Sequence, residues 1–78
     1  MNITLNGTGH ELPDGASVST LVSQVTGKTL TPSGRSADGG RLGVAVARNA
    51  DVVPRSQWHG TALADGDDVE LVTAVQGG

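Results

Sequence analysis

The chain has 78 residues, of which 36% are apolar, one is aromatic and none is cysteine, and its formal net charge is −3. This size allows one small domain, which buries only roughly 60% of the surface that its unfolded chain exposes. The lack of cysteine excludes a disulfide framework, a thiolate zinc site and a cysteine nucleophile, and it favours a reducing, cytoplasmic location. Five cations against eight acidic residues argue against nucleic acid as a partner, and no apolar stretch approaches the roughly 20 residues of a membrane span.

The first predicted element is a β-hairpin. Ile3 and Leu5 alternate with polar residues, and this period of two is typical of a half-buried strand over residues 2 to 6. Asn6-Gly7 then supplies two residues that tolerate positive φ. A short second strand is expected over residues 10 to 12.

A helix is predicted next, with Ser17 as its N-cap and Gly27 just after its last turn. Its apolar residues have the spacing i, i+3, i+4, i+7, which places them on one face: Val18, Leu21, Val22 and Val25. Because the helix is rich in valine, serine and threonine, its intrinsic propensity is low. We therefore expect packing against the sheet to stabilise it.

The segment from residue 28 to 41 has one large apolar residue, Leu30, among many small and polar ones. Such a segment cannot bury enough surface to offset the entropy of ordering. We therefore predict a mobile loop, which is unusually long for so small a domain. Gly27-Lys28-Thr29 matches the end of a phosphate-binding loop, but the glycine that this motif needs five positions earlier is replaced by Val22.

Three further strands are predicted in the second half of the chain. Alternation favours strands over residues 42 to 48 and 69 to 75, and a short edge strand at Val52 and Val53 is stopped by Pro54. The resulting order, ββαβββ or ββαββ, predicts an α+β domain over residues 1 to 75, with one helix across one face of a mixed four- to five-stranded sheet. The ubiquitin-like β-grasp fold has this order of elements.

Side chains suited to catalysis or metal binding are sparse. His10 and His59 have no carboxylate or second histidine at a ligand or catalytic spacing. The acidic residues of the sequence Asp65-Gly66-Asp67-Asp68 lack the extended loop and distal glutamate of a calcium site, so we predict a tight, solvated turn there. Trp58 is expected to pack in the core. No catalytic residue and no metal site are predicted.

The last residues, Gln76-Gly77-Gly78, are predicted to form a flexible tail beyond the last strand. They present a carboxylate on a stalk with few side chains, and only glycine lets the backbone of another protein close around the stalk from all sides. One interpretation is that the Gly78 carboxylate is activated with ATP inside a partner and then receives sulfur. The plainer interpretation is a frayed end that happens to be glycine.

Three stretches resemble the ThiS family, the sulfur carriers of thiamine biosynthesis. These stretches are MNITLNG (residues 1 to 7), NADVVPRSQW (49 to 58) and DGDDVELVTAVQGG (65 to 78). Residues 28 to 41 lie outside the resemblance and look like an insertion. Where the family usually has Asn-Gly the chain has Asn49-Ala50, so the turn type there stays open, because alanine disfavours positive φ.

The resemblance implies a β-grasp fold and a protein co-substrate that is not itself an enzyme and binds no cofactor. It implies that an E1-like enzyme of the ThiF type adenylates Gly78 with ATP. Sulfur from a cysteine desulfurase then gives a thiocarboxylate, which donates its sulfur to a thiazole synthase of the ThiG type. Three alternatives remain open at this point: the small subunit of molybdopterin synthase, a ubiquitin-like protein modifier, and a plain interaction module.

Partner docking is expected on the sheet face opposite the helix, near the tail. Gln76 and Gly77 are candidates for recognition of the tail, and the candidate interface residues are Val72, Ala74, Val75 and Arg55. Alternation alone does not say whether Val72 and Ala74 or Val75 face outward. The segment 28 to 41 is expected to be dispensable if it lies away from the tail, and to affect partner choice if it lies near.

Overall fold

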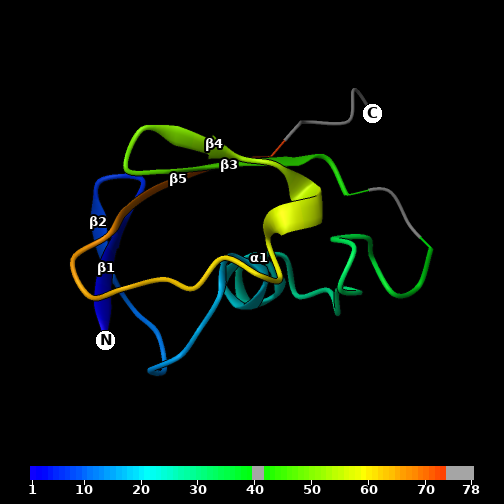
Figure 1. The fold of residues 1–78 in the computed structure, drawn as a ribbon, viewed down its shortest axis with the longest axis horizontal. Coiled ribbons are helices and arrows are strands. Elements are labelled where there is room, and N and C mark those ends of the chain that lie inside the picture. Colours follow the sequence, from blue (N-terminus) through cyan, green and yellow to red (C-terminus); the bar gives the residue numbers. More distant parts are fainter. Residues whose placement is uncertain (40–41, 74–78) are drawn as a thin grey trace.

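The computed structural model describes residues 1–39 and 42–73, which form one five-stranded sheet with one helix across it (Figure 1). In chain order the elements are β1 (Asn2–Leu5), β2 (Thr8–Glu11), α1 (Val18–Thr26), β3 (Val44–Arg48), β4 (Asp51–Val53), the 3-10 turn η1 (Arg55–Gln57) and β5 (Asp68–Thr73). The strand order is β2-β1-β5-β3-β4, with β1 and β5 parallel and the other neighbours antiparallel. The α+β class and the ββαβββ order are therefore confirmed.

Two tight turns set the strand register in the two hairpins. Asn6 and Gly7 have φ of 51° and 81°, and Asn49 and Ala50 have φ of 50° and 72°. Positive φ at both central residues is the signature of the type I′ turn, whose twist matches that of the flanking strands. The second hairpin thus has this turn even though alanine occupies its second position.

The second strand begins two residues earlier than predicted, because the tight turn pairs Leu5 directly with Thr8. The strand β2 therefore spans Thr8–Glu11 rather than residues 10 to 12. The third predicted strand also begins later than expected. The N–H of Val44 donates to the carbonyl of Leu42 at 3.0 Å, and this local bond comes just before the first rung of β3.

The helix α1 has the predicted caps. The N–H of Thr20 donates to Ser17 Oγ and the N–H of Ser17 donates to Thr20 Oγ1, both at 3.2 Å, which forms a capping box. Gly27 follows the last turn with φ of 73°. The apolar stripe is buried only over the first turns of the helix, because Val25 is 43% exposed.

The core lies between α1 and the sheet and is closed at one end by Trp58. The Trp58 side chain is 1% exposed and its Nε1 donates to the Val53 carbonyl at 2.9 Å, which confirms its predicted place in the core. Around it pack the buried apolar residues Ile3, Leu12, Val18, Leu21, Val22, Leu42, Val46, Val53, Leu63, Val69 and Leu71.

The described part of the segment after the helix has a defined hydrogen-bonded path. Leu30 and Ser36 form an isolated antiparallel bridge. Within it, the N–H of Thr31 donates to the Arg35 carbonyl at 2.7 Å. These bonds make a small hairpin in the middle of the segment. The mobility expected for residues 28 to 41 stays a prediction.

Candidate functional site: the open face of the sheet

The sheet face opposite α1 carries an uncovered apolar strip over β5, β3 and β4. Val72 is 63% exposed and Val52 is 76% exposed. Val72 lies directly opposite Ala45, and Val52 lies directly opposite Ala47. Directly paired residues in an antiparallel sheet have Cβ atoms about 4.5–5.5 Å apart, so these four side chains form one strip, which we call the open face.

The register of β5 settles which of its residues face outward. Val69 and Leu71 are buried, at 0% and 6% exposure, and Glu70 and Val72 alternate with them on the open face. Grouped exposed apolar side chains typically mark an interaction site. Val72 therefore points outward on the open face, while its part in docking stays a prediction.

The tail follows the open face directly in the chain. Thr73 is the last described residue and pairs with Val44 at one end of β3. The remaining candidates that the sequence singled out lie outside the described residues: Ala74, Val75, Gln76, Gly77 and Gly78.

Arg55 is exposed at the end of the sheet nearest Thr73, but its guanidinium is already engaged. Its Nη2 donates to the Leu42 carbonyl, and its Cζ lies 5.5 Å from the centre of the Trp58 ring. Since a guanidinium has five N–H groups, donors remain for a partner. Its place in a partner interface stays a prediction.

The acidic turn before β5 is only partly solvated, so that prediction was wrong for Asp67, which is 8% exposed. Its Oδ2 accepts the Ala64 N–H at 2.8 Å, its Oδ1 accepts from Asn49 Nδ2 at 3.1 Å, and Arg48 Nη1 lies 3.6 Å away. The Ala64 N–H lowers the pKa of Asp67 from its ordinary value, burial opposes this, and Asn49 and Arg48 lower it further. This carboxylate holds two turns together at the end of the sheet far from the tail.

The ionisable side chains of residues 1–39 and 42–73 are not clustered in the manner of metal ligands. No three His, Asp or Glu of these ranges are grouped as metal ligands. His10 Nε2 lies 2.6 Å from Gln24 Oε1, and His59 is exposed. No helix of the described chain is long and apolar enough to cross a membrane.

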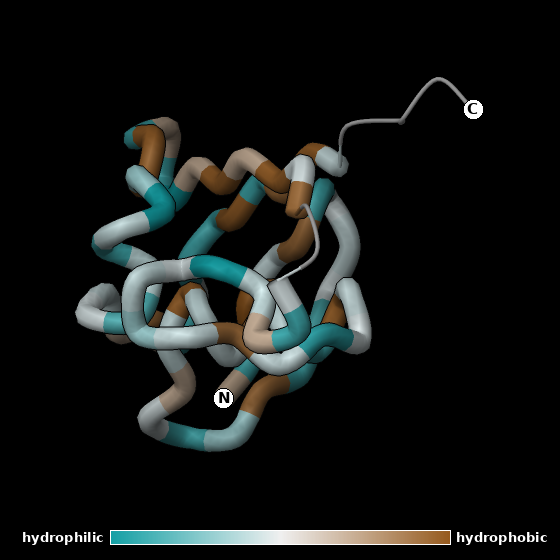
Figure 2. The backbone as a smooth tube through the Cα atoms, turned by 90° about the vertical axis from the view of Figure 1, so that its right-hand side faces the viewer, coloured by the Kyte–Doolittle hydropathy of each residue, from teal (hydrophilic) through white to brown (hydrophobic). Residues whose placement is uncertain are grey.

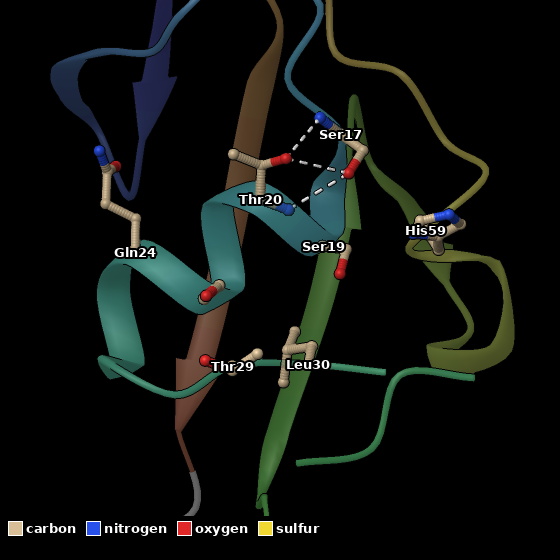
Figure 3. Close-up of a pocket in the computed structure, with 8 residues that line it drawn as sticks. Ser17, Ser19, Thr20, Gln24, Thr29, Leu30 and His59 are labelled. Carbon is tan, nitrogen blue, oxygen red and sulfur yellow. Dashed lines mark hydrogen bonds between the residues drawn. The ribbon is translucent and has the colours of Figure 1, made fainter. Parts of the chain in front are cut away.

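A shallow hollow of about 440 Å³ lies between α1 and the segment that follows it (Figure 3). Hydroxyl groups dominate its lining, which includes Ser17, Ser19, Thr20, Ser23, Thr29 and His59. Several of these hydroxyls are used by the chain itself: Ser17 and Thr20 form the capping box, and Ser23 Oγ donates to the Lys28 carbonyl at 2.6 Å. The hollow therefore belongs to the local structure of the helix, and the open face remains the stronger candidate site.

A mixed five-stranded sheet crossed by one helix, with an apolar face left open on the other side, defines a small α+β domain of the ubiquitin-like β-grasp class. The ThiS family model matches residues 3–78. The chain belongs to the ThiS family, the sulfur carriers of thiamine biosynthesis. No curated protein matches the chain.

Two solved structures support this assignment. The crystal structure of the thiamine biosynthesis protein ThiS from Geobacter metallireducens is 28% identical, with a TM-score of 0.68 and 100% of both chains covered. A solution structure of a thiamine biosynthesis protein from the same organism is also 28% identical, with a TM-score of 0.70, and covers 100% of this chain and 88% of that one. The fold and the family of this chain are therefore those that the sequence motifs predicted.

Proposed function

We propose that this protein carries sulfur on its last residue, as a thiocarboxylate of Gly78, and donates it to a thiazole synthase of the ThiG type. The observation that carries the proposal is the family match, which extends through the Gly-Gly terminus to residue 78. The open face supports it, because a carrier must be recognised by the enzymes that act on its tail. In this role the protein is a co-substrate, and ATP is used by its partner.

The proposed cycle begins with activation of a poor electrophile. A carboxylate oxygen of Gly78 attacks the α-phosphate of ATP on an E1-like enzyme of the ThiF type, pyrophosphate leaves, and an acyl-adenylate forms. The terminal sulfur of a persulfide made by a cysteine desulfurase then attacks the acyl carbon and displaces AMP. A thiol reduces the resulting acyl disulfide, which releases the thiocarboxylate and leaves the two other sulfur atoms joined as a disulfide.

The residues of this chain position the reaction rather than perform it. Gln76 and Gly77 thread into the partner, where the lack of side chains on the glycines lets the partner's backbone enclose the stalk. The open face, which includes Val72, docks against the partner, and Ala74 and Val75, which follow closely in the sequence, contribute to the same interface. Arg55 contributes a charged contact beside it.

Mass spectrometry of the intact protein tests the proposal. After incubation with ATP, the ThiF-type enzyme, a cysteine desulfurase, cysteine and a reducing thiol, we expect the mass to rise by the replacement of one oxygen with sulfur. A chain that lacks Gly78 should stay unmodified and keep the fold, because a tail beyond β5 contributes little to the core. An unchanged mass of the full chain, or isopeptide-linked adducts in its place, would contradict the proposal.

A further inference from the structure

The segment after the helix packs against η1 instead of extending away from the domain. Gly34, with φ of 84°, lies so close to Arg55 that a Cβ on it would overlap the Arg55 Cγ and carbonyl oxygen. The N–H of Gly34 donates to the Thr31 carbonyl at 2.9 Å, which closes the turn at this point. Gly34 is buried by this contact, while Arg35 beside it is exposed.

This contact lies at the end of the sheet where the described chain ends. Arg55 donates to the Leu42 carbonyl, and Val44, two residues later, pairs with Thr73. Figure 1 shows the segment 28–39 and the end of β5 toward the same end of the domain, and Figure 2 views the molecule from that end. We call the surface formed by residues 31–36 and Arg55 the shoulder.

The shoulder is cationic although the chain as a whole is negative. Arg35 and Arg55 are exposed, and no carboxylate of the described residues lies within 4.0 Å of either guanidinium. The two other described basic side chains, Lys28 and Arg48, do have carboxylate partners, at 3.4 and 3.6 Å.

Acidic side chains gather at the opposite end of the sheet. Asp51 follows the turn after β3, Asp68 begins β5, and Asp65 lies in the turn before it, and all three are exposed. Among the described residues, charge is therefore distributed unevenly between the two ends of the sheet, and the two arginines that lack a carboxylate partner lie at the end near Thr73.

We infer that the shoulder is a docking surface for an acidic protein surface and that it selects the partner that receives the tail. The inference rests on the proposed function, because a partner acting on Gly78 must face this end of the sheet. The five residues 74 to 78 span at most about 18 Å when fully extended, so the partner's active centre lies within that distance of Thr73.

The chemistry of the two arginines fits this role. Arg55 is held by Leu42 and by the Trp58 ring, so little side-chain freedom is lost when its remaining N–H groups bind a carboxylate. A net charge of −3 repels an acidic partner at long range. A local pair of cations therefore favours one orientation of the partner, in which the shoulder and the start of the tail face it.

The test is the kinetics of adenylation of Gly78 by the ThiF-type enzyme of the same organism. Arg35→Gln removes one positive charge from the shoulder, and Thr8→Glu, on the edge strand β2 at the far side of the sheet, changes the net charge by the same amount. We expect Arg35→Gln to raise KM by about two- to fivefold with kcat unchanged. Thr8→Glu should leave KM unchanged. Arg35→Lys, which keeps the positive charge, should have a KM close to that of the native chain.

Two further measurements separate a docking role from general effects. The difference between Arg35→Gln and the native chain should shrink at high ionic strength, because exposed charges are screened over about 8 Å at physiological salt. Gly34→Ala, which displaces the turn from Arg55 without changing the charge, should raise KM as well.

Equal KM values for Arg35→Gln and the native chain would overturn the inference while leaving the sulfur-carrier function intact. Absence of adenylation of the native chain would instead contradict the proposed function, and the inference with it.

Discussion

Val72 and Val69 lie on the same strand but point to opposite faces of the sheet, so one substitution made at each site separates docking from folding. Val72 is 63% exposed on the open face, and Val69 is 0% exposed in the core. Valine to threonine replaces a methyl group by a hydroxyl of similar size and keeps the β-branched shape that suits a strand. We expect Val72→Thr to weaken partner binding and Val69→Thr to weaken the fold.

The magnitudes follow from burial. Loss of one buried methyl costs about 0.8 kcal/mol, and burial of a hydroxyl without a partner costs about 1–3 kcal/mol. A docking partner can cover at most the 63% of Val72 that is exposed, which scales the sum to about 1–2.5 kcal/mol, or roughly five- to sixtyfold in the dissociation constant. At Val69 the full sum applies, so the free energy of unfolding should fall by about 2–4 kcal/mol.

Two assays measure these effects separately. Titration calorimetry with the ThiF-type enzyme gives the dissociation constant, and urea unfolding followed by Trp58 fluorescence gives the free energy of unfolding. Val72→Thr should change the latter by less than about 0.5 kcal/mol, and Val52→Thr, on the same open face, should behave similarly. If Val72→Thr binds as tightly as the native chain, the open face is not the docking surface. If it destabilises the fold as much as Val69→Thr does, the outward placement of Val72 is wrong.

Three further predictions concern the fold. Trp58→Phe leaves the Val53 carbonyl without its donor and opens a cavity, so the thermal unfolding curve measured by circular dichroism should show a loss of about 2–3 kcal/mol; an unchanged curve would contradict the role given to Nε1. Ala50→Gly relieves positive φ and should stabilise the protein by about 0.5–1 kcal/mol in urea, whereas a loss of stability would argue against the type I′ turn. Asp67 has a pKa below its ordinary value of 3.8, so its stabilising effect is present above that pH and is lost as the pH falls through the lowered pKa. Asp67→Asn should therefore flatten the acid limb of the stability profile, and an unaltered limb would show that other groups cause it.

Much of the fold was predictable because the decisive signals are local. Asn6-Gly7 favours a tight turn wherever it occurs, and the capping residues Ser17 and Gly27 bound α1 as expected. The second strand was misplaced although its signal is local, because the two-residue turn at Asn6-Gly7 pairs Leu5 directly with Thr8. The burial of Asp67 was missed because its hydrogen bond from Asn49 joins turns that are distant in the sequence.

The sequence indicated which family the chain belongs to, but not which face of the last strand points outward. The motif around Trp58 and the terminal glycines identified the family from residue types and spacing, and the family match confirmed it. The outward direction of Val72 could not be read from alternation, because a strand has two equivalent faces until it pairs with its neighbours. The burial of Val69 and Leu71 in the core, against the exposure of Val72, resolves this ambiguity.

The order of elements, their turns and caps and the family of this protein thus follow from patterns within a few residues of one another, where backbone preference is strong. The joint position of Arg35, Arg55 and Thr73 does not follow from such local patterns, because these residues are far apart in the chain. They share one end of the sheet only because Gly34 packs on Arg55, Arg55 binds Leu42, and β3 pairs with β5. Contacts of this kind depend on the packed core, which no local pattern encodes.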